Sequence, residues 1–176
     1  AEDGIRDDLV TGVQTCALPI CNVLDILIYV FDRYMLVDTP DVPERDELAR
    51  KLQRAGFSDE NVERALDWLA DLASERHRPQ LEAGGGGAMR VFTEHERQHL
   101  PADCRGYLIA LERTGILSAQ QREIVIDRLL ALDADELDVD RLKWVTLMVL
   151  SSQPGEEDAC ARMEDLLFDL PPERPH

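Results

Sequence analysis

Val23-Leu24-Asp25-Ile26-Leu27-Ile28-Tyr29-Val30-Phe31 is the stretch of sequence that decides the fold. Apolar side chains recur there at i, i+3, i+4, i+7 and i+11, the spacing of one helix face: Leu24, Leu27, Ile28, Phe31 and Met35. Val23, Ile26 and Val30 widen this stripe, so the pattern predicts a mostly buried helix. Pro40 and Pro43 follow and prevent its continuation. We expect the first half of the chain to pack around this helix.

Two more helices are predicted in the first half, and together they resemble a helix-turn-helix unit. The first runs from Glu44 to Arg54 and ends at Ala55-Gly56, where glycine suits a left-handed C-terminal cap. Ser58 caps the second, whose apolar face comprises Val62, Ala65, Leu66, Leu69 and Ala73. A DNA-reading helix must approach phosphates closely, yet this one carries five carboxylates and one arginine between residues 59 and 71. We therefore expect a pair that docks protein, and we do not expect direct binding to nucleic acid.

The second half predicts one short strand and a series of short capped helices. Residues 89–92 read Met-Arg-Val-Phe and have the composition of a short strand. Thr93 with Glu96, and Ser118 with Gln121, have the spacing of capping boxes. Other helices are expected to begin at Pro101, at Asp138 and after Pro154-Gly155. The fold class expected is therefore all-α.

Composition divides this all-α chain into two small helical subdomains, residues 22–76 and 89–170. Residues 77–88 contain Gly84-Gly85-Gly86-Gly87, whose backbone entropy predicts a flexible linker. The proline-rich residues 171–176 are expected to be frayed. Residues 1–21 look foreign, because Val10 to Ile20 resembles the in-frame translation of a sequencing-library adapter. A signal peptide does not fit, since residues 1–8 carry four acids and one arginine.

Charge and composition exclude several classes of protein. The 176 residues carry a formal net charge of −17, and 44% are apolar but only 5% aromatic. Such a chain can build an aliphatic core, but it offers neither a phosphate-binding surface nor a base-stacking platform. No window approaches the roughly 18 apolar residues of a membrane span. Cys104 and Cys160 are expected to be core thiols of a cytoplasmic protein, since no Cys-x-x-Cys is present.

His95-Glu96-Arg97-Gln98-His99 is the one string that predicts metal chemistry. On a helix it places two imidazoles one turn apart to hold zinc, with Glu96 as the base for a bound water. The alternative is a solvated helix with two surface histidines, and three features favour it. Thr93 puts His95 in the first helical turn, Pro101 follows His99 closely, and no third ligand has a supporting spacing.

Two other segments do not fit known ligand-binding loops. The acidic run 133–140 lacks the glycine of a calcium loop, and Gly84 to Gly87 lacks the Lys-Ser or Lys-Thr of a phosphate loop. We expect no cofactor.

Seven blocks of the sequence form a recognisable set: residues 23–31, Ala55-Gly56-Phe57, 65–69 (Ala-Leu-Asp-Trp-Leu), 104–108 (Cys-Arg-Gly-Tyr-Leu), 123–128 (Glu-Ile-Val-Ile-Asp-Arg), 142–150 (Leu-Lys-Trp-Val-Thr-Leu-Met-Val-Leu) and Met163-Glu164. Together these blocks resemble the Smg protein family, a bacterial family of unknown function. The resemblance covers nearly all of residues 22–176. It implies a small, acidic, cytoplasmic, mainly helical protein, often encoded beside DNA-processing genes. It brings no catalytic residues to this chain.

Two functions therefore stand as hypotheses, and the favoured one is a non-enzymatic protein-interaction module with an unknown protein partner. Its aromatic anchors would be Trp68, Tyr107 and Trp144 if they are exposed, whereas on helical faces such rings usually belong to the core. Arg105 beside Gly106 is the second candidate, because glycine permits close approach and arginine can bind a carboxylate through two hydrogen bonds. The alternative function is a zinc-dependent hydrolase that uses His95, Glu96 and His99.

Overall fold

The computed structural model describes residues 22–35, 43–75, 90–132 and 137–168. These residues form eight helices: α1 (Val23–Tyr34), α2 (Arg45–Arg54), α3 (Asp59–Glu75), α4 (Glu94–His99), α5 (Ala102–Arg113), α6 (Ala119–Leu130), α7 (Val139–Ser151) and α8 (Glu157–Phe168). The all-α class is confirmed. None of these helices has the length and the apolar stretch needed to cross a bilayer. The predictions for residues 1–21, 77–88 and 171–176 fall outside the described residues.

Local capping signals place the helix ends where the sequence predicts them. The Thr93 and Ser118 side chains each accept a hydrogen bond from the backbone N–H three residues on, and the Glu96 and Gln121 side chains accept one from the backbone N–H of Thr93 and Ser118, respectively. Asp138 caps α7 by accepting from the Arg141 backbone N–H at 2.8 Å. Each cap satisfies a backbone donor that the first turn of a helix leaves unpaired.

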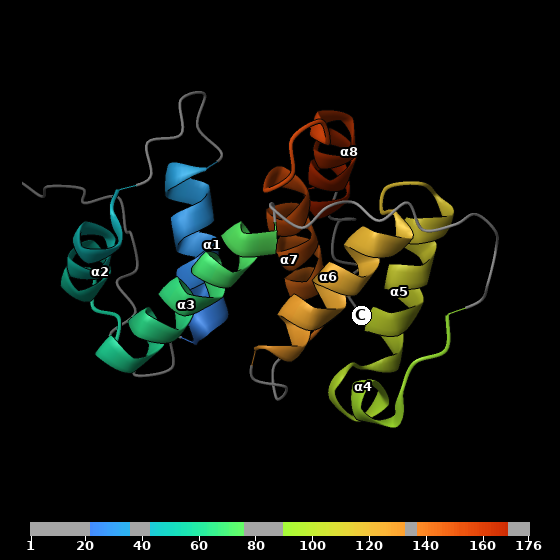
Figure 1. Ribbon diagram of the computed structural model, residues 1–176, viewed down its shortest axis with the longest axis horizontal. Coiled ribbons are helices and arrows are strands. Elements are labelled where there is room, and N and C mark those ends of the chain that lie inside the picture. The colour runs from blue at the N-terminus through green and yellow to red at the C-terminus, as the bar shows by residue number, and fades with distance from the viewer. Residues whose placement is uncertain (1–21, 36–42, 76–89, 133–136, 169–176) are drawn as a thin grey trace, which may run out of the picture.

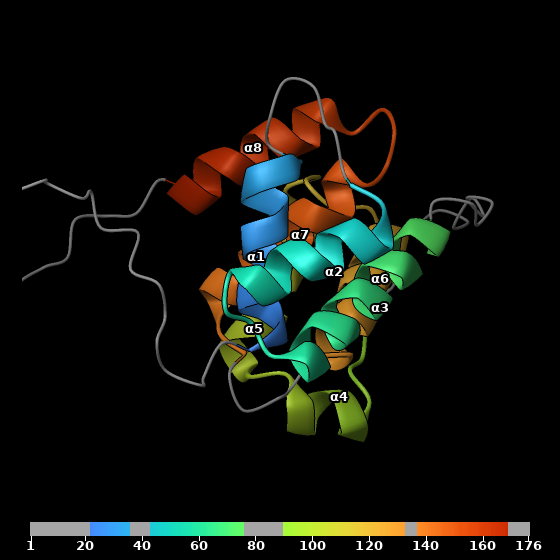
Figure 2. The same cartoon turned by 90° about the vertical axis from the view of Figure 1, so that its left-hand side faces the viewer.

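Helix α7 lies at the centre of the arrangement and packs against α1, α5, α6 and α8. Figure 1 shows α1 to α3 on one side of it and α4 to α6 on the other, and in Figure 2 the side with α1 to α3 faces the viewer. Seven of the nine residues from Leu142 to Leu150 are buried, all but Lys143 and Trp144, which explains why apolar residues occupy most of the circumference of this segment. The buried side chains form one apolar cluster with members from both the 22–76 and the 89–170 segments.

The strand expected at residues 89–92 is wrong for its described part, residues 90–92, which form no strand. This segment is held by side-chain contacts and not by backbone hydrogen bonds to a neighbouring strand. The Arg90 guanidinium lies 4.5 Å from the centre of the Phe92 ring, and Arg90 is ion-paired to Glu96 and Glu123. One smaller expectation also changes: Ala73, which was expected on the apolar face of this helix, is exposed on α3.

Candidate functional site

A groove opens on the surface where α6 runs past the end of α3 and the start of α4. Its volume is about 360 Å³, and it is lined by Glu75, Glu96, Gln120, Glu123, Ile124, Ile126, Asp127 and Leu130. We call it the α6 groove. Five of these residues, at positions 120, 123, 124, 127 and 130, follow the i, i+3, i+4 spacing of one helix face. The groove is therefore built mainly on the outer face of α6.

The α6 groove combines an apolar floor with an acidic rim. Ile126 is buried, while Ile124 and Leu130 are half-buried and pack against the apolar core. Four carboxylates, those of Glu75, Glu96, Glu123 and Asp127, stand around them, and the lining contains no lysine, arginine or histidine among the described residues. A surface of this kind can hold apolar side chains and cations together.

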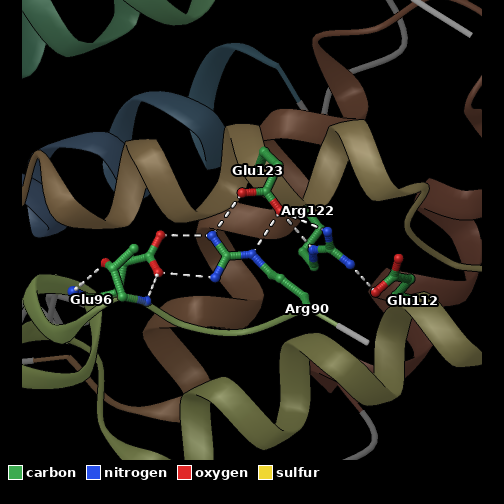
Figure 3. A network of polar contacts seen from close by, with 6 residues as sticks. Arg90, Glu96, Glu112, Arg122 and Glu123 are labelled. Atoms are coloured by element: carbon green, nitrogen blue, oxygen red, sulfur yellow. Dashed lines mark hydrogen bonds and ion pairs between the residues drawn. The ribbon is translucent and has the colours of Figure 1, made fainter. Parts of the chain in front are cut away.

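Arg90 anchors the rim between α4 and α6. Its Nη1 and Nη2 donate to the two carboxylate oxygens of Glu96 at 3.0 and 2.6 Å. Its Nε and Nη2 donate to the carboxylate of Glu123, both at 2.7 Å. Figure 3 shows the guanidinium between the two acids, in the fork geometry that makes such pairs strong.

Arg122 continues the network toward α5. It forms an ion pair with Glu112, and its Nη2 donates to Oε1 of Glu123 at 2.7 Å. The side chains of Arg90 and Arg122 are only 12% and 9% exposed, whereas that of Glu123 is 49% exposed. The arginines therefore lie beneath the surface, and within this network it is the carboxylate of Glu123 that faces solvent.

The same contacts keep Glu96 and Glu123 ionised. Hydrogen bonds from the Arg90 guanidinium lower the pKa of Glu96 to about 2 and also lower the pKa of Glu123. Asp127 accepts from Nη2 of Arg128 at 2.6 Å, yet its side chain stays 68% exposed. Glu96 and Glu123 therefore stay negative well below neutral pH, and Asp127 presents its carboxylate to solvent beside them.

The His-Glu-x-x-His string lies on α4, away from any third ligand among the described residues. The rings of His95 and His99 lie 4.2 Å apart, and Nδ1 of His99 lies 2.8 Å from the carbonyl oxygen of His95. Glu96 is occupied by Arg90 and by the backbone N–H of Thr93. Within the described ranges no three His, Cys, Asp or Glu side chains are placed to share a metal ion. No observation favours the zinc hydrolase.

Arg105 is engaged inside the molecule, and Gly106 faces solvent. Nη1 of Arg105 donates to the carbonyl oxygens of Leu100 and Arg97, at 2.5 and 3.1 Å, and so caps the end of α4. Gly106 is exposed in α5, and a Cβ added there would meet no atom within 4 Å. The fold itself therefore does not need a glycine at position 106.

The three predicted aromatic anchors have different environments. Trp68 is 3% exposed and takes the core role that the sequence offered as its alternative. Trp144 is half-buried and packs edge-on against Phe31, with ring centres 6.4 Å apart. Tyr107 is half-buried under the ammonium of Lys143, and its buried hydroxyl makes no hydrogen bond within the described residues.

Neither described cysteine has the character of a nucleophile. Cys104 is buried, Cys160 is half-buried, and both are free thiols. Burial raises the pKa of each thiol to about 11, so both are protonated at neutral pH.

Comparison with known proteins places the chain in a family. The sequence profile described as "Protein of unknown function (DUF494)" matches residues 23–176. A protein from Thioalkalivibrio sulfidiphilus, named Protein Smg homolog, is 46% identical over 155 residues that cover 88% of this chain and 98% of that protein. This chain belongs to the Smg family.

Other Smg homologues are similar to the same degree. The protein from Stenotrophomonas maltophilia is 47% identical over 88% of this chain and 98% of its own length. The Nitrosococcus oceani protein is 44% identical over 84% of this chain and 94% of its own length. No solved structure matches the chain. The family is confirmed, and it brings no assigned activity.

Apart from Glu96, the base in the alternative zinc-hydrolase hypothesis, no lining residue of the α6 groove was expected from the sequence to be a binding residue. One signal was present. In the helix that begins after Ser118, Val125, Leu129 and Leu132 have the i, i+4, i+7 spacing of one buried face, which leaves Ile124 and Leu130 as apolar residues on its other side. Apolar residues outside the buried face of a short helix indicate a second contact surface.

Proposed function

We propose that this Smg protein is a non-enzymatic, cytoplasmic protein-interaction module that docks its partner in the α6 groove. The observation behind this proposal is the composition of the groove, in which the exposed carboxylates of Glu123 and Asp127 lie beside half-buried Ile124 and Leu130. Protein interfaces combine an apolar centre with a polar rim in the same way.

The protonation state of the rim supports binding over proton transfer. A general acid or base works best when its pKa lies near the working pH, whereas the pKa of Glu96 lies near 2. Its carboxylate therefore acts as a fixed negative charge. Because such a rim repels phosphates, the link to DNA processing that the family resemblance implies would run through a protein partner.

The experiment that tests this function is affinity capture with a matched pair of variants. Gln120 is half-buried in the lining, so Gln120→Lys places a positive charge in the groove. Gln53 is exposed on α2 and lies outside the lining, so Gln53→Lys makes the same change in net charge elsewhere. The full-length chain and both variants are used as bait in a nuclease-treated lysate of Stenotrophomonas maltophilia, whose Smg homologue is 47% identical.

The expected result is one saturable protein captured by the unmodified chain and by Gln53→Lys, and lost with Gln120→Lys. Capture that survives Gln120→Lys, or no captured protein at all, would contradict the proposal. Circular dichroism of each variant verifies that the helical content is unchanged.

A further inference from the structure

Resting on the proposed function, we infer the chemistry of the occupant: a basic amphipathic helix of the partner protein, laid along α6. Its apolar side chains would cover Ile124 and Leu130, and its lysines or arginines would meet Glu123 and Asp127.

Charge complementarity selects a basic occupant over a neutral or acidic one. The two acids on the outer face of α6 are the exposed ones, with Glu123 49% and Asp127 68% exposed. The arginines that pair with them point into the protein: the side chain of Arg122 is 9% exposed and that of Arg128 10%. An incoming cation therefore meets carboxylate oxygens first. The chain's net charge of −17 steers such a partner toward the protein from a distance.

The geometry of α6 selects a helical occupant. Glu123 and Asp127 are four residues apart in one helix, so they are separated by about 6 Å along its axis at 1.5 Å per residue. Cations one turn apart on a second helix match that interval. From Gln120 to Leu130 the groove face extends about 15 Å by the same rise, which accommodates about three turns of a partner helix.

The partner helix also needs an apolar stripe between its basic residues, to contact the apolar floor of the α6 groove. Ile124, Ile126 and Leu130 offer the floor, and Ile124 and Leu130 remain half-buried without an occupant. An amphipathic helix docks in a groove through residues at i, i+3, i+4 and i+7. The occupant is therefore defined as a helix with leucine-like residues at those positions and lysine or arginine on their flanks.

Titration of a synthetic peptide tests this inference without the natural partner. The probe has about 16 residues, roughly four turns, with leucines along one face, lysines on its flanks and a fluorophore at one end. A second peptide carries glutamate in place of every lysine. Fluorescence anisotropy at about 0.15 M salt, where long-range attraction is screened beyond roughly 8 Å, follows binding to the full chain, Gln120→Lys and Gln53→Lys.

We expect the lysine peptide to bind the unmodified chain and the glutamate peptide not to bind. Gln120→Lys is expected to weaken binding about tenfold, the effect of one like charge at a partly desolvated contact, and Gln53→Lys less than about twofold. If both variants weakened binding of the lysine peptide equally, the attraction would depend only on the net charge of the protein. That result would overturn the inference. So would a glutamate peptide that binds as well as the lysine peptide.

A second pair of variants keeps the test sound if Gln120→Lys loses helical content. Ile124→Ala removes part of the groove floor, and Leu166→Ala removes an exposed leucine of similar size on α8. Ile124→Ala is expected to weaken binding of the lysine peptide about fivefold, in keeping with a lost apolar contact, and Leu166→Ala is expected to leave binding unchanged.

The capture and peptide experiments together separate this inference from the proposed function. If capture of the protein depends on Gln120 but the lysine peptide does not bind, the proposed function stands and this inference fails. If Gln120→Lys captures the protein as well as the unmodified chain does, the proposed function fails.

Discussion

The indole N–H of Trp68 donates a hydrogen bond of 2.9 Å to the backbone carbonyl of Arg128. This bond joins α3 to α6 across 60 residues of sequence. Beside it, the guanidinium of Arg128 pairs with Asp71 at 3.3 Å and with Asp127 at 2.6 Å. Because α3 and α6 supply two sides of the α6 groove, these contacts fix the separation of its walls.

Trp68→Phe is expected to lower the free energy of unfolding by about 1–3 kcal/mol, because the Arg128 carbonyl loses its donor in a buried site. Urea denaturation followed by circular dichroism measures this difference. A loss below about 0.5 kcal/mol would show that the bond does not hold α3 to α6, since changes away from such features stay within that range.

Tyr107→Phe is the counterpart, because it removes a buried hydroxyl that has no hydrogen bond within the described residues. Removing an unpaired buried polar group is expected to leave stability unchanged or to raise it by up to about 1 kcal/mol. The same urea experiment compares the two aromatic-to-phenylalanine changes. A marked loss of stability in Tyr107→Phe would mean that the hydroxyl has a structural partner.

Glu96→Gln tests the ion pair with Arg90 while it retains the capping box, because glutamine at this position can still accept from the Thr93 backbone N–H. The variant is expected to be about 1–3 kcal/mol less stable than the unmodified chain at pH 7. Glu94→Gln is the matched control on α4, since its ion pair with Arg97 is exposed; it should cost less than about 0.5 kcal/mol.

The stability difference caused by Glu96→Gln also has a predicted pH dependence. The pKa of Glu96 is lowered from 4.5 to about 2 on folding. Its contribution to stability is therefore fully present above pH 5 and disappears as the pH falls toward 2. Unfolding curves for both proteins between pH 7 and pH 2 should converge at the acid end. A difference that stays constant over this range would exclude the ion pair as its source.

Gly106→Ala is expected to raise stability by about 0.5–1 kcal/mol, because the position is helical, exposed and spacious enough for a methyl group. Gly115→Ala serves as the contrast. Gly115 has φ +70°, where a Cβ is strained, so this change should cost about 1 kcal/mol. If Gly106→Ala stabilises the protein but abolishes partner capture, the partner approaches α5, and the α6 groove loses its assigned role.

The helix ends could be predicted from the sequence because they depend on neighbouring residues. Thr93 with Glu96, and Ser118 with Gln121, complete their capping boxes within one turn. Gly56, with φ +100°, follows the end of α2 where the left-handed conformation was expected. Such signals need no knowledge of the tertiary arrangement.

The groove could not be predicted because it depends on residues far apart in the sequence. The conformation of residues 90–92 is held by an ion pair between Arg90 and Glu123, which are 33 residues apart, so a local propensity for a strand was misleading. Arg105 was likewise expected to be free to bind a partner's carboxylate, but in the fold it donates to a backbone carbonyl at the end of α4. From the sequence, Ile124 and Leu130 indicated only a second contact surface on α6. The groove itself exists because α3 and α4 lie beside that surface and contribute Glu75 and Glu96 to its lining.

Site-specific photocrosslinking can show whether the partner binds in the α6 groove. The photoreactive residue benzoylphenylalanine replaces Gln120 in the groove, Gln53 on α2 or Gly106 on α5, and the full-length chain is irradiated in the same lysate. We expect one light-dependent adduct with a single protein from position 120 and none from position 53 or 106. An adduct from position 106 with none from position 120 would contradict this expectation and would place the binding surface on α5.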